Sequence, residues 1–217
     1  MKSYEIQELI TEDIDRIYLI NLKENYIEYK NQKEEIKIDH YKLIKQLPWQ
    51  DFIKIDKHLI INLNHVSRCI GNQLCVNEVF YTIESKYRLL TQQFNYIGGI
   101  KRLNIPHFTK HLFIHQGNEY LVHKYTDIPY IKASGSYSEI IIRNNKSYIL
   151  SMNISTLSNN LCKTHFLRIN RSIIINISQI KSYNHTFIWL KGINEPVSIS
   201  RIKKDEILRL LNLKFSY

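Results

Sequence analysis

The sequence predicts a mostly β fold with short helices, arranged as two similar domains in tandem. Two observations predict it. Short runs of β-branched and aromatic residues alternate with turn residues along the whole chain of 217 residues, as is typical of antiparallel strands. In addition, the segment 166–176 (Phe-Leu-Arg-Ile-Asn-Arg-Ser-Ile-Ile-Ile-Asn) has a weaker copy at 52–62 (Phe-Ile-Lys-Ile-Asp-Lys-His-Leu-Ile-Ile-Asn). The 114 residues that separate the two copies leave room for one domain each.

The second copy of this block combines a buried strand with a cationic loop. Ile173, Ile174 and Ile175 favour an extended, pleated backbone because they are β-branched. The polar residues just before them include Arg171. A loop held between apolar strands can present a guanidinium group rigidly to phosphates or to base edges.

The first half of the chain is expected to begin with a small antiparallel meander at residues 14–38. Asp39 can cap a helix that ends at Pro48, with Tyr41, Ile44 and Leu47 on one face. The repeated block, a hairpin and a helical turn follow.

The second half repeats this order. Gly98 and Gly99 mark a boundary. We therefore expect a first domain at 1–97, a linker at 98–110 and a second domain at 111–217. The second domain opens with a hairpin around Gly117 that has no full equivalent in the first half. It ends in an amphipathic helix whose apolar residues are Ile202, Ile207, Leu210 and Leu211.

The net positive charge of the chain is confined to its second half. The whole chain has a net charge of +10. Residues 1–97 carry 13 Lys and Arg against 14 Asp and Glu, a net charge of −1, whereas residues 98–217 carry 17 against 6, a net charge of +11. A basic domain of this size is typical of proteins that bind nucleic acid or an anionic membrane surface.

Other features favour a cytoplasmic protein without a membrane anchor. No apolar run approaches the roughly 18–20 residues that span a bilayer. The N-terminus lacks the apolar region of a secretory signal. The three cysteines form no Cys-x-x-Cys pair, which favours reduced thiols.

Three segments of the second half together resemble the LytTR DNA-binding domain. They are residues 128–137 (Ile-Pro-Tyr-Ile-Lys-Ala-Ser-Gly-Ser-Tyr), residues 166–176 and residues 197–201 (Val-Ser-Ile-Ser-Arg). The resemblance covers nearly all of residues 111–211, and residues 13–94 resemble the same family more faintly. It implies two elongated β domains in tandem, whose loops enter successive major grooves of double-stranded DNA. It also implies DNA-contacting residues. Base contacts would fall on Tyr137, Arg171 and Arg201, and phosphate contacts on Arg168, Asn170, Ser136 and Ser200.

The first copy carries a weaker set at the same positions. Tyr26 and Lys57 would stand for Tyr137 and Arg171, and either Ser85 or Lys86 would stand for Arg201. Asp56 replaces Asn170, and its carboxylate should repel phosphate. This copy is therefore expected either to bind an adjacent half-site weakly or to serve as an interaction or sensing module.

No residue pattern indicates catalysis, a cofactor or a metal. His107, His111 and His115 recur every four residues, but Pro106 and the turn at Gly117 break the helical face that metal ligation would need. The segment 134–136 (Ser-Gly-Ser) lacks the flanking residues of a phosphate loop or a nucleophile elbow. We therefore expect no enzyme activity.

The leading interpretation is a transcriptional regulator that binds double-stranded DNA sequence-specifically through its second domain. A second copy of the chain or another regulatory protein is considered as a further partner. The alternative is a protein-interaction or ligand-sensing module of the same fold that binds an acidic partner, and RNA binding is a third, weaker option.

Overall fold

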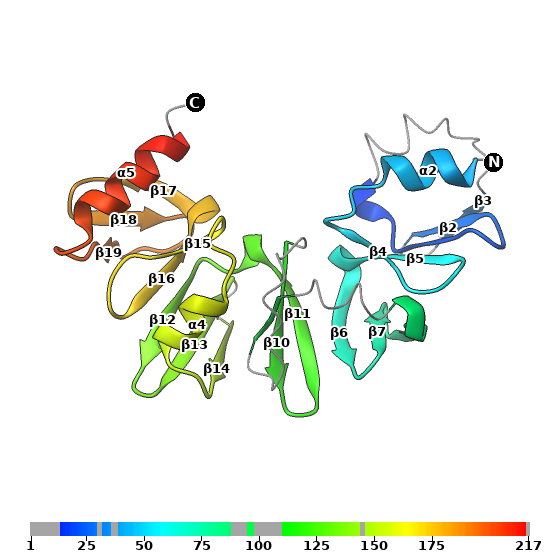
Figure 1. Cartoon of the computed structure of the whole chain (residues 1–217), viewed down its shortest axis with the longest axis horizontal. Coiled ribbons are helices and arrows are strands. Elements are labelled where there is room, and N and C mark those ends of the chain that lie inside the picture. Colours follow the sequence, from blue (N-terminus) through cyan, green and yellow to red (C-terminus); the bar gives the residue numbers. More distant parts are fainter. Residues whose placement is uncertain are drawn as a thin grey trace. The chain divides into compact units, whose positions relative to one another are not determined.

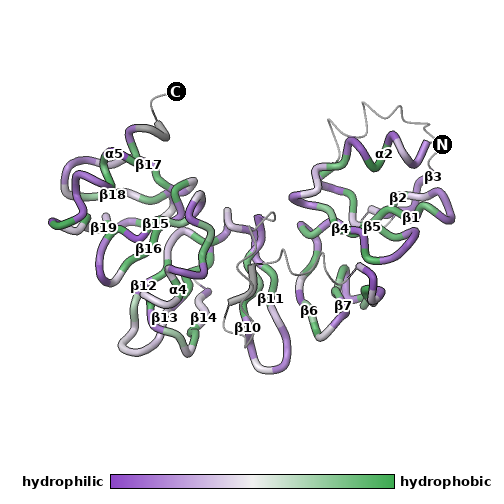
Figure 2. Tube along the Cα trace, viewed as in Figure 1, coloured by the Kyte–Doolittle hydropathy of each residue, from purple (hydrophilic) through white to green (hydrophobic). Residues whose placement is uncertain are grey.

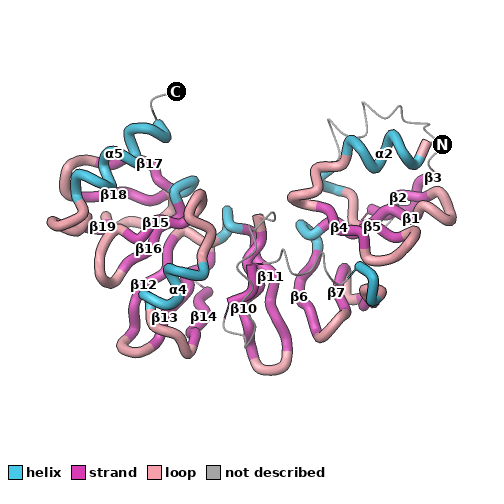
Figure 3. The backbone as a smooth tube through the Cα atoms, viewed as in Figure 1, coloured by secondary structure: helices cyan, strands magenta, loops and turns pink. Residues whose placement is uncertain are grey.

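A computed structural model describes residues 14–29, 32–35, 39–87, 95–97, 110–143 and 146–215. Strands dominate the described chain, with helices few and short (Figure 3). The chain divides into two compact units, Met1–Val122 and His123–Tyr217 (Figure 1). The predicted fold class is therefore confirmed.

Each unit is built on a five-stranded antiparallel sheet of the same topology. In the first unit the order is β3-β2-β1-β5-β4, and in the second it is β14-β13-β12-β16-β15. The strands of the first sheet are β1 (Leu19–Asn21), β2 (Tyr26–Tyr29), β3 (Gln32–Glu35), β4 (Phe52–Lys54) and β5 (Leu59–Asn62). Those of the second are β12 (Tyr130–Ser134), β13 (Tyr137–Ile142), β14 (Lys146–Leu150), β15 (Phe166–Arg168) and β16 (Ile173–Asn176).

The repeated block occupies the same two strands in both units. Phe52 pairs with Asn62 across β4 and β5, and Phe166 pairs with Asn176 across β15 and β16. The buried side chain of each asparagine donates to main-chain carbonyls of the segment before the first strand, Asn62 to Ile17 at 2.9 Å and Asn176 to Tyr125 at 2.6 Å. The predicted repeat is thus a structural one. Each copy ends in an asparagine whose amide also accepts, because Oδ1 of Asn62 accepts from the amide of Asn64 at 2.9 Å and Oδ1 of Asn176 from that of Ser178 at 3.0 Å.

One short helix packs on each of these sheets. Helix α2 (His40–Gln46) is capped by the side chain of Asp39, as predicted, and α4 (Ile154–Asn160) by that of Asn153. Helix α4 contacts β13, β15 and β16. The buried face of α2 differs from the expected one, because Leu43 and Leu47 are buried whereas Tyr41 is 67% exposed.

A second sheet follows in each unit, and here the units differ. The second unit has the order β17-β18-β19, formed by β17 (Ile180–Tyr183), β18 (Phe187–Leu190) and β19 (Val197–Ser198). The first unit has the order β8-β7-β6-β11-β10-β9. Its strands are β6 (Val66–Ile70), β7 (Gln73–Val76), β8 (Val79–Thr82), β9 (Asn95–Ile97), β10 (His111–Gln116) and β11 (Glu119–Lys124).

The predicted hairpin at residues 111–122 exists, but it does not lie where the sequence placed it. Tyr120 pairs with Cys69 and Leu121 with Arg68, so β11 extends the sheet of the first unit. The two compact units divide after Val122. Strand pairing decided this, because an apolar hairpin next to an open sheet edge gains main-chain hydrogen bonds and burial together. The linker predicted at 98–110 stays a prediction, because residues 98–109 lie outside the described part of the chain.

The hairpin and the last helix close equivalent cores. In the first unit Phe113 and Val122 complete a cluster that includes Ile55, Leu74 and Ile83. In the second unit helix α5 (Lys204–Phe215) supplies Ile207 and Leu211 to a cluster that includes Ile169, Ile188 and Ile199. Ile202 and Leu210 were expected on this buried face, but they are 96% and 44% exposed, and Ile202 precedes the helix.

Apolar segments fall on strands and on the inner face of the helices, while most turns are hydrophilic (Figure 2). Within the described residues, no helix is long and apolar enough to cross a membrane.

Candidate nucleic-acid interface

The first loop of the second unit joins β12 to β13. Ser134 pairs with Tyr137, which leaves Gly135 and Ser136 as a two-residue turn. Gly135 has a φ of +59°, a conformation that glycine adopts at little cost. The turn fixes Tyr137 at the strand end with half of its surface exposed.

The second loop, residues 169–172, is held from inside by Arg168. Its Nε donates to the carbonyl of Asn170 at 3.1 Å, and a terminal nitrogen donates to the carbonyl of Arg171 at 2.9 Å. The other terminal nitrogen donates to Ser155 Oγ of α4 at 2.9 Å. The guanidinium thus uses its planar set of donors within the protein, which fixes the loop against the helix.

Hydrogen bonds tie this loop to both of its neighbours. Asn170 accepts from the amide of Ser172 at 2.7 Å and donates to the carbonyl of Ser198 at 2.8 Å. The amide of Ser200 donates to the carbonyl of Ile169, and that of Ala133 to the carbonyl of Ser172, both at 2.8 Å. The three loops that carry the predicted site residues therefore form one cross-linked cluster.

Arg171 and Arg201 lie on this cluster, and both are exposed. Among the described residues, no hydrogen bond or ion pair engages either guanidinium group. Ile202 and Lys203 follow Arg201, and both are exposed as well. The cluster therefore presents cations and an apolar side chain that a ligand can contact without first breaking an internal contact.

The surrounding charge favours an anionic ligand. Residues 123–217 contain 14 Lys and Arg against 5 Asp and Glu, a net charge of +9, whereas residues 1–122 contain 16 against 15, a net charge of +1. Glu139, two residues after Tyr137, is neutralised by Lys132 at 3.0 Å. The Lys132 hydrogen bond lowers the pKa of Glu139, and a second bond from Ser147 adds to this.

The equivalent cluster of the first unit is built on the same main chain with different charges. Ile55 accepts from the amide of Glu84 at 2.9 Å, as Ile169 does from Ser200, so Glu84 stands in the place of Ser200 and Ser85 in that of Arg201. Asp56 accepts from the amides of His58 and Leu59, the turn-forming role that Asn170 has in the second unit. Two carboxylates therefore flank this cluster.

Tyr26 does not stand at the position of Tyr137. Asn21 pairs with Tyr26, and its counterpart Lys132 pairs with Glu139, so Tyr26 is equivalent to Glu139. The shorter turn of the first unit shifts the alignment by two residues, which strand alternation alone cannot reveal. Lys33 lies over the ring of Tyr26, 4.4 Å from its centroid.

The structure brings most of the predicted residues together, and they differ in exposure and in internal contacts. Arg171, Arg201, Tyr137 and Ser136 are exposed on the cluster, Ser200 is half-buried there, and Lys57 is exposed in the first unit. The polar atoms of Arg168 and Asn170 are used inside the protein. No local pattern in the sequence marks Ser155, the partner of Arg168. The exposed Lys203 was not predicted either, although the basic run after Arg201 could have indicated it.

The family model of the LytTr DNA-binding domain matches this chain twice, at residues 7–89 and 118–212. Together the two matches cover most of the chain. The protein belongs to the LytTR DNA-binding domain family, with two copies of the domain in one chain.

Known relatives share one of these copies. The transcriptional regulatory protein YpdB of Escherichia coli K12 is 33% identical over 92 residues, which cover 40% of this chain and 37% of YpdB. YpdB of Shigella flexneri matches to the same extent. This match spans little more than a third of the length of those relatives. A solved LytTr DNA-binding domain from Bacillus cereus is 18% identical, with a TM-score of 0.39 over 47% of this chain and 96% of that one.

Proposed function

We propose that the protein is a transcriptional regulator whose second unit reads double-stranded DNA in the major groove. The observation that carries this proposal is the pair of exposed guanidinium groups, Arg171 and Arg201, on a cross-linked loop cluster. Arginine binds guanine O6 and N7 in a bidentate manner, which contributes about 1–3 kcal/mol of discrimination per base pair. Loops that are already fixed lose little conformational entropy when they bind.

We assign different roles to the residues of the cluster. Arg171 and Arg201 contact base edges, with Tyr137 beside them. Ser136 and Ser200 contact phosphates. Arg168 and Asn170 hold the loop, since their polar atoms already bond within it. The exposed side chain of Ile202 is suited to contact a thymine methyl group.

The first unit is proposed to add little DNA affinity of its own. Phosphate contacts dominate protein–DNA affinity, and the carboxylate of Asp56 opposes such contacts at its loop cluster, where Glu84 is paired with Lys86 at 3.4 Å. Lys57 is the exposed cation that remains on the equivalent loop. The tether can still help this unit to occupy an adjacent half-site, because it raises the local concentration.

Selection of bound sequences from a random duplex library, followed by substitution, tests the proposal. Arg171→Ala and Arg201→Ala should each weaken binding to the selected duplex about 5- to 150-fold, as expected for about 1–3 kcal/mol. Lys181→Ala is the matched control, since it removes one exposed cation from β17, at the end of the second sheet away from Ser198. If both arginine variants bind the duplex as tightly as Lys181→Ala, the assignment fails.

The same experiment addresses the alternative, a module that binds an acidic partner. Such a module would select no consensus sequence. Its affinity for duplexes would follow total charge, so Lys181→Ala would reduce affinity as much as Arg171→Ala. A consensus with one site would mean that the second unit alone recognises the DNA sequence. A consensus of two direct repeats would mean that both units recognise it.

A further inference from the structure

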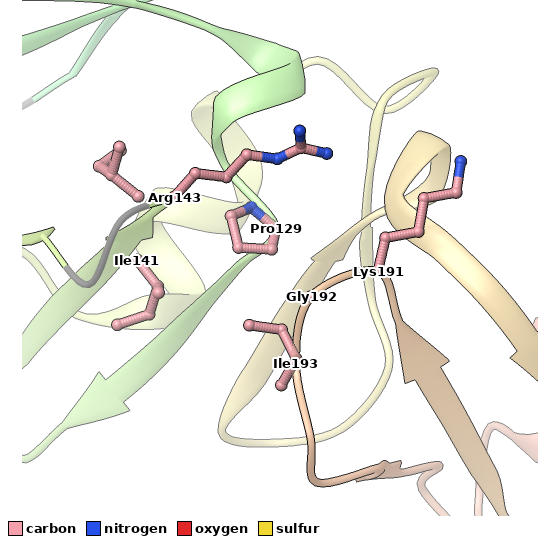
Figure 4. A pocket seen from close by; sticks show the side chains of 7 residues that line it. Pro129, Ile141, Arg143, Lys191, Gly192 and Ile193 are labelled. Carbon is pink, nitrogen blue, oxygen red and sulfur yellow. The ribbon is translucent and has the colours of Figure 1, made fainter.

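A cavity of about 400 Å³ opens in the second unit, beside the ends of β13 and β18. Its apolar wall includes Pro129, Ile141 and Ile193, and its charged wall consists of Arg143 and Lys191. In Figure 4 the guanidinium and ammonium groups lie on one side of the opening, while Ile141 and Ile193 lie together on the other side. The volume falls within the range of about 300–1,000 Å³ that is common for small-molecule sites.

The two cations are fixed in place, but their charges are not neutralised. Arg143 donates to Gln179 Oε1 at 2.5 Å, and Lys191 donates to the carbonyl of Ser178 at 3.1 Å. Gln179 also holds the main chain of Lys191, whose amide donates to the Gln179 carbonyl at 2.8 Å. Both cations thus bond to neutral acceptors. Among the described residues, no carboxylate pairs with Arg143 or Lys191.

The repeat provides an internal comparison. In the first unit the equivalents of Ile141 and Gly192 are Glu28 and Glu78, and that of Lys191 is Asn77. The equivalents of Pro129 and Gln179 are Tyr18 and His65, whose rings are in contact at a tilt of 36°, with their centroids 4.2 Å apart. By position in the sequence, the first unit keeps a cation only in place of Arg143, where it has Lys30, while a neutral residue replaces Lys191 and glutamates replace Ile141 and Gly192. The combination of two cations with an apolar wall is therefore specific to the sequence of the second unit.

The cavity is separate from the proposed DNA interface. Strand β13 begins at Tyr137, beside the first loop, and Arg143 follows its last residue. Six residues of strand cover about 20 Å. Likewise, β18 pairs with Ser198 at its first residue, and Lys191 follows its last. Both cations therefore lie at strand ends opposite the loop cluster.

We propose that this cavity binds a small organic anion. The carboxylate or phosphate group lies between Arg143 and Lys191, and a short branched or aromatic body packs on Ile141, Ile193 and Pro129. An uncharged ligand would leave two cations unneutralised, and an inorganic anion would leave the apolar wall exposed. The proposal does not depend on DNA binding.

Titration of the full-length chain, followed by 15N NMR of the backbone amides, tests this inference. The probes are 3-phenylpropanoate, its uncharged amide 3-phenylpropanamide, phenyl phosphate and inorganic phosphate. We expect 3-phenylpropanoate, phenyl phosphate or both to shift the backbone amide signals of Arg143, Lys191, Gly192 and Ile193. The uncharged 3-phenylpropanamide should bind at least about tenfold more weakly than 3-phenylpropanoate, as expected from the loss of one charge-assisted contact. Whichever of these two aromatic anions binds more tightly shows whether the site prefers a carboxylate or a phosphate group. Inorganic phosphate should bind more weakly than the tighter-binding aromatic anion.

Variants link binding to the cavity. Arg143→Gln and Lys191→Gln should each weaken binding of the tighter probe about tenfold, as should Ile141→Glu, which introduces the residue of the first unit. Arg209→Gln, an exposed cation on α5, is the control and should leave affinity unchanged. Circular dichroism confirms that each variant is folded. The inference is overturned if no aromatic anion shifts these amides at millimolar concentration. It is also overturned if the three cavity variants bind like Arg209→Gln.

Discussion

The guanidinium of Arg168 donates a hydrogen bond of 2.9 Å to the main-chain carbonyl of Arg171. One arginine of the loop thereby fixes the backbone from which the other is presented. Arg168 is anchored in turn on Ser155 of α4, so the position of Arg171 depends on a helix that precedes it in the chain. The two arginines of the repeated block have different contacts, although in the sequence they look alike.

Replacing Arg168 should weaken DNA binding indirectly. Arg168→Ala removes three hydrogen bonds and should lower duplex affinity about tenfold, because residues 169–172 then lose conformational entropy on binding. Hydrogen exchange should accelerate in this loop. Arg168→Lys keeps the charge but not the planar fork, so it should restore only part of the affinity. Full recovery with lysine would mean that Arg168 acts as a phosphate contact.

The first unit should gain DNA affinity when its loop cluster is given the charges of the second. The change Asp56→Asn keeps the turn-forming oxygen and removes a carboxylate, and Ser85→Arg introduces the guanidinium of Arg201. The double variant should bind a duplex with two direct repeats more tightly than the parent, with a salt dependence steeper by about one to two units of slope. Fluorescence anisotropy at several salt concentrations measures this. An unchanged slope would show that the first unit does not reach DNA.

Phe113 should be essential to the first unit. Its side chain is fully buried in a core with Leu74 and Ile83. Phe113→Ala should cost about 3–5 kcal/mol of unfolding free energy, and the loss should fall on the first unit. Hydrogen exchange can assign the loss, since β6 and β7 should exchange faster while β16 is unaffected. Faster exchange in β16 and normal protection in β6 would place the hairpin in the second unit instead.

His123 should make the second unit less stable in mild acid. Burial lowers the pKa of His123, Lys146 adds to this, and Asp127 opposes it. Its Nε2 is buried without a hydrogen-bond partner among the described residues. The unfolded chain therefore takes up the proton first as the pH falls. The stability that neutral His123 contributes is complete above about pH 6.5 and is lost as the pH falls from there toward the lowered pKa.

Urea denaturation at pH 7.5, 6.5 and 5.5 checks this. The midpoint of the parent should fall more between pH 7.5 and 5.5 than that of His123→Gln, which cannot be protonated. The other histidines are present in both proteins, so their contribution cancels when the fall in midpoint of His123→Gln is subtracted from that of the parent. Parallel curves would mean that His123 is not desolvated.

The sequence predicted well what depends on local chemistry. The helix cap at Asp39 and the repeat of the block 52–62 at 166–176 both follow from residue types and their order. Register was harder, because alternation is preserved when a strand shifts by two residues, and Tyr26 was therefore aligned with Tyr137 instead of Glu139. Helix faces were predicted in part, since α2 buries Leu43 rather than Tyr41.

By itself, the sequence determined the strand-rich repeat, the family to which both copies belong, and the concentration of positive charge in the second copy. These depend on residue types and their order. The tertiary structure alone decided that the hairpin of β10 and β11 completes the first unit, that Arg168 holds the loop while Arg171 is free to bind, and that Arg143 and Lys191 meet at one cavity. Each of these depends on contacts between residues distant in the chain. Such contacts are set by edge pairing and core packing, which the local pattern of residues does not encode.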